Sequence, residues 1–294
     1  MSGNGDHSTP VVSVIMPTFN DRQVIGDAIQ SIVNQTFDSW ELLVVDDAST
    51  DGTADFVAKN FQDPRISVIR MESNSGSGVC RNRAIAAARG DFVAVMDADD
   101  ISLPQRLELQ VDQLRLDPDL GAVSAQVLEF GTWGGPVPGS WPTDSSNIRD
   151  RQLAKKMPIP HPAAMFRRQQ VIDVGGYDEA CLRAQDFSLL LRLGNIKLAT
   201  LDTPLVKYRT NRPIGLGYVI RNDWYADLAR RRNSAQLNGT RLDELPTEVQ
   251  KSIRGLAGSC KSWLIRNTRE QWQLLRLKRN PNLRRTHSDT SWGS

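Results

Sequence analysis

The sequence has few of the residues that mark several common classes of protein. Its 294 residues include three cysteines, which lie far apart at Cys80, Cys181 and Cys260 and form no CxxC pair. A zinc site or a disulfide framework is therefore not expected, and a reducing compartment fits best. No apolar run approaches the roughly 18 residues that span a bilayer, and residues 1–10 lack the charged and apolar regions of a signal peptide. We therefore expect a cytoplasmic protein.

The charge balance argues against one further class of protein. The net charge is only +2, with 36 Lys or Arg against 34 Asp or Glu, so nothing suggests a nucleic-acid partner. Hydrophobic residues make up 39% and charged residues 24% of the chain, and both values are close to those of ordinary globular proteins. The length suits one large α/β domain with an extension.

Apolar runs and helical patterns alternate along the first 120 residues. The runs at 11–16, 42–45, 66–69 and 92–96 predict strands, and amphipathic patterns between them predict helices. Such alternation with short connections is typical of a mostly parallel sheet with helices on both faces. Further along, residues 121–128 predict another strand, and residues 187–193 and 218–237 predict helices.

Two of the predicted strands end on carboxylates. Residues 92–96 run into Asp97, Asp99 and Asp100, and residues 42–45 run into Asp46 and Asp47. Ionised carboxylates this close repel one another, and a divalent cation such as Mn²⁺ or Mg²⁺ relieves that repulsion. Because ligands bind outside the carboxyl ends of strands in open α/β sheets, we expect a metal-held phosphate site here. The alternative is a polar loop whose Asp100 caps the following helix.

Two glycine-containing segments are open to more than one interpretation. Residues 75–78, Ser-Gly-Ser-Gly, match neither a Walker A sequence nor a full GxGxxG, although Arg81 and Arg83 just after them could counter a pyrophosphate. Residues 130–144 are rich in Gly and Pro and carry two tryptophans. They are either a mobile loop near a ligand or an irregular surface segment.

Several of these pieces, taken together, resemble glycosyltransferase family 2. The matching stretches are Val-Ile-Met-Pro-Thr-Phe-Asn (14–20), Val-Val-Asp-Asp-Ala-Ser-Thr-Asp-Gly-Thr (44–53), Arg-Asn-Arg-Ala (81–84), Gly-Asp-Phe-Val-Ala-Val-Met-Asp-Ala-Asp-Asp (90–100), and the segments 161–168, 175–179 and 185–193. The resemblance covers about residues 11–210. It implies a GT-A fold, which is Rossmann-like, together with an inverting reaction and a nucleotide-sugar donor.

The resemblance also implies roles for residues of the donor site. Pro17, Thr18 and Asn20 would lie beside the nucleoside, and Asp47, with Asp46 next to it, would bind the base, typically uracil. Arg81 is counted with these nucleotide-binding candidates because of its position after the Ser-Gly loop. Asp97 and Asp99 would form the DxD motif, with Asp97 near the ribose and the metal and Asp99 as the direct ligand.

The acceptor side of the site is implied in the same way. Asp186 falls where the catalytic base of the family lies, and Gln185 stands where a Glu is usual. Transfer with inversion needs one such base to take the proton of the acceptor hydroxyl. Asp186 could instead simply cap the predicted helix at 187–193. His161 and Gln185 are candidate acceptor-site residues.

The C-terminal region is strongly basic. Residues 251–285 hold ten Lys or Arg and one acidic residue, Glu270, interleaved with Trp and Leu. Such a helical segment could lie on the inner face of a membrane as a peripheral contact, or could pack on the catalytic domain. The expected organisation is a disordered stretch at 1–10, a transferase domain at 11–210, a basic helical extension at 211–285 and a disordered tail at 286–294.

The predicted function is a metal-dependent inverting glycosyltransferase. It would move a sugar from a nucleotide sugar, with a UDP-sugar as the expected donor, to a hydroxyl acceptor in polysaccharide or glycoconjugate biosynthesis. A nucleotidyltransferase is an alternative, but such an enzyme would need a basic Gly-rich loop after the first strand, and residues 17–21 do not form one. A non-catalytic nucleotide-sugar-binding subunit is a second alternative, kept open by Gln185.

Overall fold

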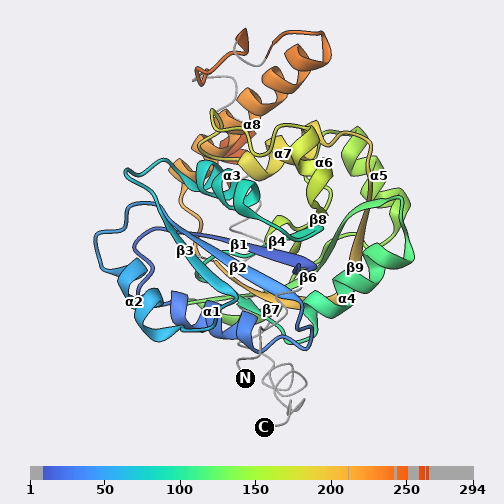
Figure 1. Ribbon diagram of the computed structural model, residues 1–294. Coiled ribbons are helices and arrows are strands. Elements are labelled where there is room, and N and C mark those ends of the chain that lie inside the picture. Colours follow the sequence, from blue (N-terminus) through green and yellow to red (C-terminus); the bar gives the residue numbers. More distant parts are fainter. Residues whose placement is uncertain (1–8, 211, 242–243, 251–257, 262, 265–294) are drawn as a thin grey trace, which may run out of the picture.

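A nine-stranded sheet forms the centre of the computed structural model, which describes residues 9–210, 212–241, 244–250, 258–261 and 263–264 (Figure 1). Its strands are β1 (Val12–Thr18), β2 (Trp40–Asp46), β3 (Ile66–Arg70), β4 (Phe92–Val95), β5 (Ile101–Ser102), β6 (Leu120–Gly131), β7 (Gly134–Pro138), β8 (Met165–Arg167) and β9 (Lys197–Arg209). They are ordered β3-β2-β1-β4-β8-β6-β9-β5, with β7 paired to β6. The long pairings, such as β1 with β2 and β6 with β9, are parallel, while the three-residue β8 runs antiparallel to both of its neighbours.

Helices cover both faces of this sheet. They are α1 (Ile25–Val33), α2 (Thr53–Asn60), α3 (Ser77–Ala87), α4 (Arg106–Leu116), α5 (Ser145–Leu153), the 3₁₀ helix η1 (His161–Ala163), α6 (Arg168–Asp173), α7 (Gln185–Arg192) and α8 (Leu216–Leu237). One face packs against α1, α2 and α4 and the other against α3, α5, α6 and α7 (Figure 1). The predicted sheet with helices on both faces is confirmed.

Alternating side chains of the buried strands supply the two halves of the core. All seven residues of β1 are buried, and Val14 and Met16 join the cluster under α1 while Ile15 joins the cluster under α3. A strand with apolar residues on both faces can sit only in the middle of a sheet. This places the carboxyl ends of β1, β2 and β4 side by side at one edge, because the three strands are parallel neighbours.

Two interpretations of the sequence are corrected by the structure. Asp100 does not cap a helix: it is fully buried and accepts a hydrogen bond from the backbone N of Arg209 at 2.7 Å, while α4 starts only at Arg106. Residues 130–144 are not wholly loop, because β6 continues to Gly131 and turns back into β7. Gly134 and Gly135 take positive φ angles of 123° and 101° at this turn, a conformation that suits glycine.

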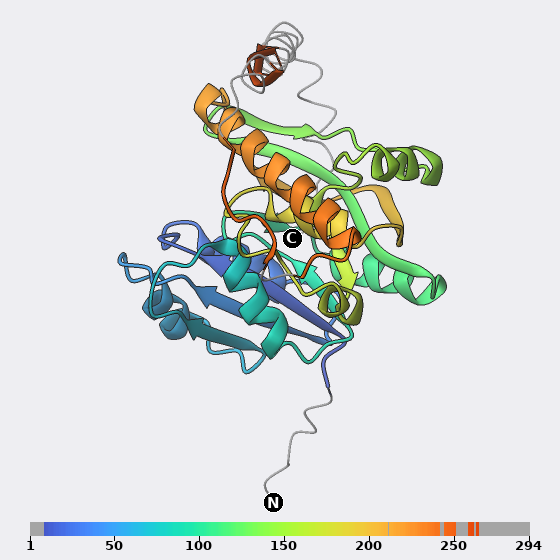
Figure 2. The ribbon, with the colours of Figure 1, turned by 90° about the horizontal axis from the view of Figure 1, so that it is seen from above.

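The C-terminal part of the described chain packs on the rest of the molecule through α8. Leu228 and Ala229 of α8 are buried against Phe187 of α7, and Figure 2 shows the orange α8 lying across this end of the molecule. Arg232 donates to both carboxylate oxygens of Asp178, at 2.6 and 2.9 Å, and both side chains are buried. The predicted C-terminal helix is thus present.

The basic segment predicted at 251–285 lies outside the described residues, apart from 258–261 and 263–264. The terminal segments 1–8 and 286–294, predicted to be disordered, lie outside them as well. None of the helices in the described ranges combines the length and apolar character needed to cross a membrane.

Candidate active site

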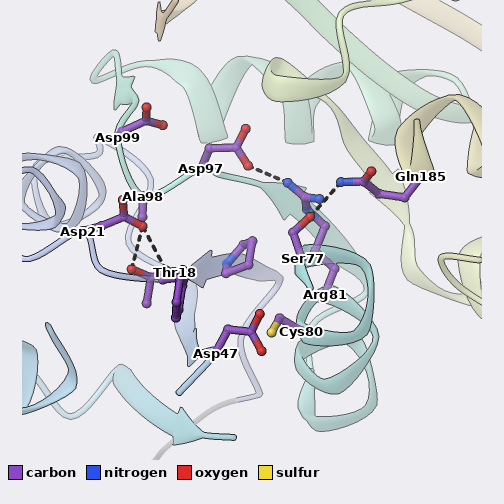
Figure 3. A pocket seen from close by; sticks show the side chains of 12 residues that line it. Thr18, Asp21, Asp47, Ser77, Cys80, Arg81, Asp97, Ala98, Asp99 and Gln185 are labelled. Atoms are coloured by element: carbon purple, nitrogen blue, oxygen red, sulfur yellow. Dashed lines mark hydrogen bonds and ion pairs between the residues drawn. The ribbon is translucent and has the colours of Figure 1, made fainter. Parts of the chain in front are cut away.

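A cavity of about 330 Å³ opens at the carboxyl ends of β1, β2 and β4. It is lined by Pro17, Thr18, Phe19, Asp21, Asp47, Ser77, Cys80, Arg81, Asp97, Ala98, Asp99 and Gln185 (Figure 3). Six of the predicted site residues therefore meet around one space, together with Gln185. They come from the ends of three strands, from α3 and from α7, so that widely separated parts of the sequence contribute to a single site.

The end of β1 forms one wall of the cavity. Thr18 is buried, and its hydroxyl donates to Asp21 at 2.9 Å, which fixes the turn that follows the strand. Asn20 does not line the cavity. It adopts a positive φ of 58°, and its side-chain oxygen accepts a hydrogen bond from the backbone N of Thr50 at 2.8 Å. Asn20 therefore joins the loop after β1 to the loop after β2.

The two carboxylates after β2 have different surroundings. Asp47 faces the cavity, and its two oxygens accept hydrogen bonds from the backbone N of Ser75 at 2.7 Å and of Gly76 at 2.8 Å. Asp46 is buried behind the cavity, where one oxygen accepts from the backbone N of Ser49 at 3.3 Å. Asp47 thus holds the Ser-Gly loop in place. Because a carboxylate can accept about four hydrogen bonds, Asp47 keeps capacity for a ligand.

A buried guanidinium stands at the centre of the site. Arg81 donates through Nη2 to Asp97 at 2.6 Å, and its side chain is only 5% exposed. Its Nε and Nη1 are buried and have no hydrogen-bond partner among the described residues. Buried N–H groups are rarely left unpaired, because losing their bonds to water is costly. Arg81 lines the cavity, and an incompletely paired cation in this place suits an anionic ligand such as a diphosphate.

Three carboxylates crowd the loop after β4. Burial, followed by the charges of Asp97 and Asp21, raises the pKa of Asp99 to about 6. Burial and the charge of Asp97 likewise raise the pKa of Asp100 well above its usual value. Arg209 lies close to Asp99, with its Nε 4.0 Å from a carboxylate oxygen. Asp97 is paired with Arg81, and the positive charge of Arg106 acts on Asp100. Asp99, whose contact with Arg209 is longer, is therefore the carboxylate of this loop best able to serve a further cation.

A divalent cation would suit the carboxylates at the edge of the cavity. Asp97 and Asp99 offer oxygen ligands beside the cavity, and hard ions such as Mg²⁺ or Mn²⁺ prefer oxygen. No group of three or more His, Cys, Asp or Glu in the described ranges is arranged to hold a metal by itself. The residues fit an ion that is completed by water and substrate phosphates, the usual arrangement for Mg²⁺.

The opposite wall of the cavity is the start of α7. Gln185 lines the cavity and donates to the hydroxyl of Ser77 at 2.7 Å, which ties α7 to α3. Asp186 follows it in the first turn and is partly buried. Burial raises the pKa of Asp186, while a hydrogen bond from the backbone N of Phe187 at 2.7 Å opposes the rise. The helix begins after Ala184, so Asp186 is not its N-cap.

His161 does not line the cavity. It is only 3% exposed, and its Nε2 lies 2.8 Å from the hydroxyl of Tyr177. Burial and the charge of Arg81 lower the pKa of His161 well below its usual value. A neutral histidine in this position orders Tyr177 beside Arg81, and it stands behind the site instead of at its surface.

Five cavity residues were not candidate site residues in the sequence: Phe19, Asp21, Ser77, Cys80 and Ala98. Ser77, Cys80 and Arg81 follow the i, i+3, i+4 spacing of one helix face. Since Arg81 was already a candidate, this spacing could have identified the other two. Burial and the nearby charge of Asp47 raise the pKa of the Cys80 thiol to about 12, so Cys80 contributes shape and a weak donor, not a thiolate.

Comparisons with known proteins agree on one family. The family model described as "Glycosyl transferase family 2" matches residues 13–176. An uncharacterized glycosyltransferase of Methanocaldococcus jannaschii is 31% identical over 212 residues, which cover 70% of this chain and 72% of the relative. A putative teichuronic acid biosynthesis glycosyltransferase of Bacillus subtilis is 43% identical over 104 residues, or 35% of this chain and 41% of the relative.

Solved structures share the fold. The mannosyltransferase PcManGT from Pyrobaculum calidifontis, solved with GDP-Man and Mn²⁺, superposes with a TM-score of 0.58 at 19% identity. The match covers 89% of this chain and 76% of that protein. The predicted GT-A-type architecture is thereby confirmed.

Proposed function

Because the chain belongs to glycosyltransferase family 2 and is a glycosyltransferase, we propose that it transfers a sugar from a nucleotide-sugar donor to a hydroxyl acceptor by a metal-dependent inverting displacement. One observation carries this proposal: Asp47, Arg81, Asp97 and Asp99 meet around one cavity, with the start of α7 on its far side. By analogy with relatives such as the teichuronic acid enzyme, we place the reaction in polysaccharide biosynthesis. The membership argues against both alternatives, a nucleotidyltransferase and a non-catalytic subunit.

The leaving group would be held by Arg81 and the DxD carboxylates. Arg81 lines the cavity, and its positive charge would attract diphosphate oxygens while Nη2 keeps its ion pair with Asp97. A divalent cation bound by Asp97 and Asp99 would add charge stabilisation as the bond between the sugar and the diphosphate breaks. Burial, followed by the charges of Asp97 and Asp21, raises the pKa of Asp99, and binding of such an ion would favour its ionised form.

The attacking group would be prepared by Asp186. One of its oxygens accepts from the backbone N of Phe187, which leaves Oδ2 to take the proton of the acceptor hydroxyl. The acceptor oxygen then bonds to the anomeric carbon as the carbon–oxygen bond to the diphosphate breaks, so one displacement inverts the configuration. A raised pKa makes the carboxylate a better base near neutral pH. His161, buried behind Tyr177, is poorly placed to contact the acceptor directly.

The donor base is assigned through Asp47. Its carboxylate is a pure acceptor beside the cavity, and the imide N–H of uracil is a donor of matching kind. We therefore propose a UDP-sugar, although the fold also accommodates GDP-Man in the mannosyltransferase from Pyrobaculum calidifontis. Thr18, Pro17 and Asp21 at the end of β1 would line the nucleoside end of the cavity.

Thermal shifts with UDP, GDP and ADP, each with and without Mn²⁺, test the donor and the metal together. A ligand at 100 times its dissociation constant stabilises the folded state by about 2.7 kcal/mol. We expect UDP with Mn²⁺ to raise the melting temperature most and Asp47→Ala to remove the preference for UDP. A larger shift with GDP would contradict the base assignment, and equal shifts without Mn²⁺ would contradict the metal. NMR of the sugar first released by donor hydrolysis then reports whether the anomeric configuration inverts.

A further inference from the structure

A second groove, of about 260 Å³, lies between α5, α7 and α8, away from the catalytic cavity. Its apolar lining residues are Leu153, Pro158, Phe187, Leu190, Leu191 and Leu237. Phe187, Leu190 and Leu191 lie at i, i+3 and i+4 on α7 and therefore share one face of that helix. The groove thus combines apolar side chains from three separate helices with polar and basic ones.

Two leucines at the groove are largely exposed. Leu153, the last residue of α5, is 63% exposed, and Leu237, the last residue of α8, is 76% exposed. Single exposed leucines are common on protein surfaces and need no explanation. Here, however, two of them line one groove, and apolar surface gathered in this way is typical of an interaction site.

The charge around the groove has a single sign. Its lining residues include Lys155, Lys156 and Arg192 and no Asp or Glu. Arg192 is occupied internally, since its Nη1 and Nη2 donate to the backbone oxygens of Val174 and Gly176, each at 2.6 Å. Both lysines are exposed. The cations available to a partner are therefore the two lysines in the turn just after Leu153.

We propose that this groove docks the protein on the surface of an anionic phospholipid membrane. Leu153 and Leu237 would enter the interface between headgroups and acyl chains, while Lys155 and Lys156 would face the lipid phosphates. Apolar side chains beside lysines, with no acidic residue among them, complement a surface that is apolar inside and negatively charged outside. A lysine stem also lets its ammonium group reach the phosphates while its methylenes stay in apolar surroundings.

The consequence for the enzyme concerns the position of α7. Phe187 lines the groove and directly follows Asp186, and an eight-residue helix is only about 12 Å long. A bilayer docked at the groove would thus lie within one short helix of the proposed base. The docking itself does not depend on the donor, the metal or the base, so it can be tested without an activity assay.

The experiment is cosedimentation of the full chain with vesicles of neutral phosphatidylcholine alone or mixed with 30 mol% phosphatidylglycerol. The groove variants are Lys155→Gln with Lys156→Gln, and Leu153→Gln with Leu237→Gln. The control variant is Lys59→Gln with Leu116→Gln, which makes one change of each kind, on α2 and α4, where Leu116 is 76% exposed. All these positions are exposed, and unchanged melting temperatures would verify the folding of each variant.

We expect binding to the anionic vesicles only. Each lysine near an anionic surface contributes about 1 kcal/mol, or roughly a fivefold factor in affinity, so the double lysine variant should bind roughly 25-fold more weakly. The leucine variant should lose at least about tenfold, and the control should bind like the wild type. Equal binding to neutral vesicles, no binding by the wild type, or undiminished binding by both groove variants would overturn the proposal. So would a groove-dependent dimer without vesicle binding, which would make a second copy the occupant.

Discussion

Replacing Asp99 by asparagine should make the ligand-free protein more stable at pH 8, although transfer should be lost. The reason is the raised pKa of Asp99, about 6 against an ordinary 3.8. A difference of this size corresponds to roughly 3 kcal/mol. Because 42% of the side chain is exposed, water weakens both the cost of burial and the repulsion from Asp97 and Asp21, and we expect about 1 kcal/mol. In a protein of this size that is a rise in melting temperature of about 2 °C.

The sign of the pH dependence follows from linkage. The folded protein holds the Asp99 proton more tightly than the unfolded chain does, so the carboxylate destabilises the fold only where it is ionised. The penalty is absent below about pH 4, grows as the pH rises towards 6, and is fully present above about pH 7. The difference between wild type and Asp99→Asn should grow over the same range. Melting curves between pH 4 and pH 8 measure it.

The matched control is Asp97, two residues earlier in the same motif. Asp97 forms an ion pair with the buried Arg81 at 2.6 Å, so Asp97→Asn leaves a buried guanidinium without its counter-charge. Removing one partner of a buried pair typically costs about 3 to 5 kcal/mol, and Asp97→Asn should therefore lower the melting temperature. If both substitutions changed stability in the same direction, the division of roles between the two carboxylates would be refuted.

Three further outcomes are expected. Asp186→Asn should lower kcat by about 10²- to 10⁴-fold with little change in nucleotide affinity, and a fully active variant would exclude Asp186 as the base. Because the pKa of Asp186 is raised, the wild-type rate should fall on acidification at a higher pH than it would with an ordinary aspartate. Asp99→Ala should remove the Mn²⁺ dependence of UDP binding in calorimetry. Arg232→Ala should cost about 3 to 5 kcal/mol in urea unfolding, against less than about 1 kcal/mol for Arg231→Ala, whose ion pair is partly exposed.

The half of the site that depends on local pattern could be predicted from the sequence. Asp47 and Asp97 each follow a buried apolar run, and the structure places them beside one cavity because β1, β2 and β4 are parallel neighbours. The end of such a strand can be located in the sequence because a strand buried on both faces needs an uninterrupted apolar run. The roles proposed for the individual residues stay predictions until the variants are measured.

The part that depends on distant contacts could not be predicted. Asp100 resembles a helix cap by position, yet its partner is the backbone of Arg209, far along the chain. The strand β8 has only three residues, too few for a periodic signal. The hairpin of β6 and β7 was not predicted, because Gly134 and Gly135, which permit its turn, are also typical of an irregular loop.

The family resemblance ends near residue 210, but residues beyond that point pack against the family motifs. Asp178 belongs to the Gly-Gly-Tyr-Asp-Glu motif, and its two oxygens are held by Arg232 of α8, beyond that limit. Leu228 of the same helix is buried against Phe187, the residue after the proposed base. A helix outside the recognisable motif therefore supports the helix that carries Asp186.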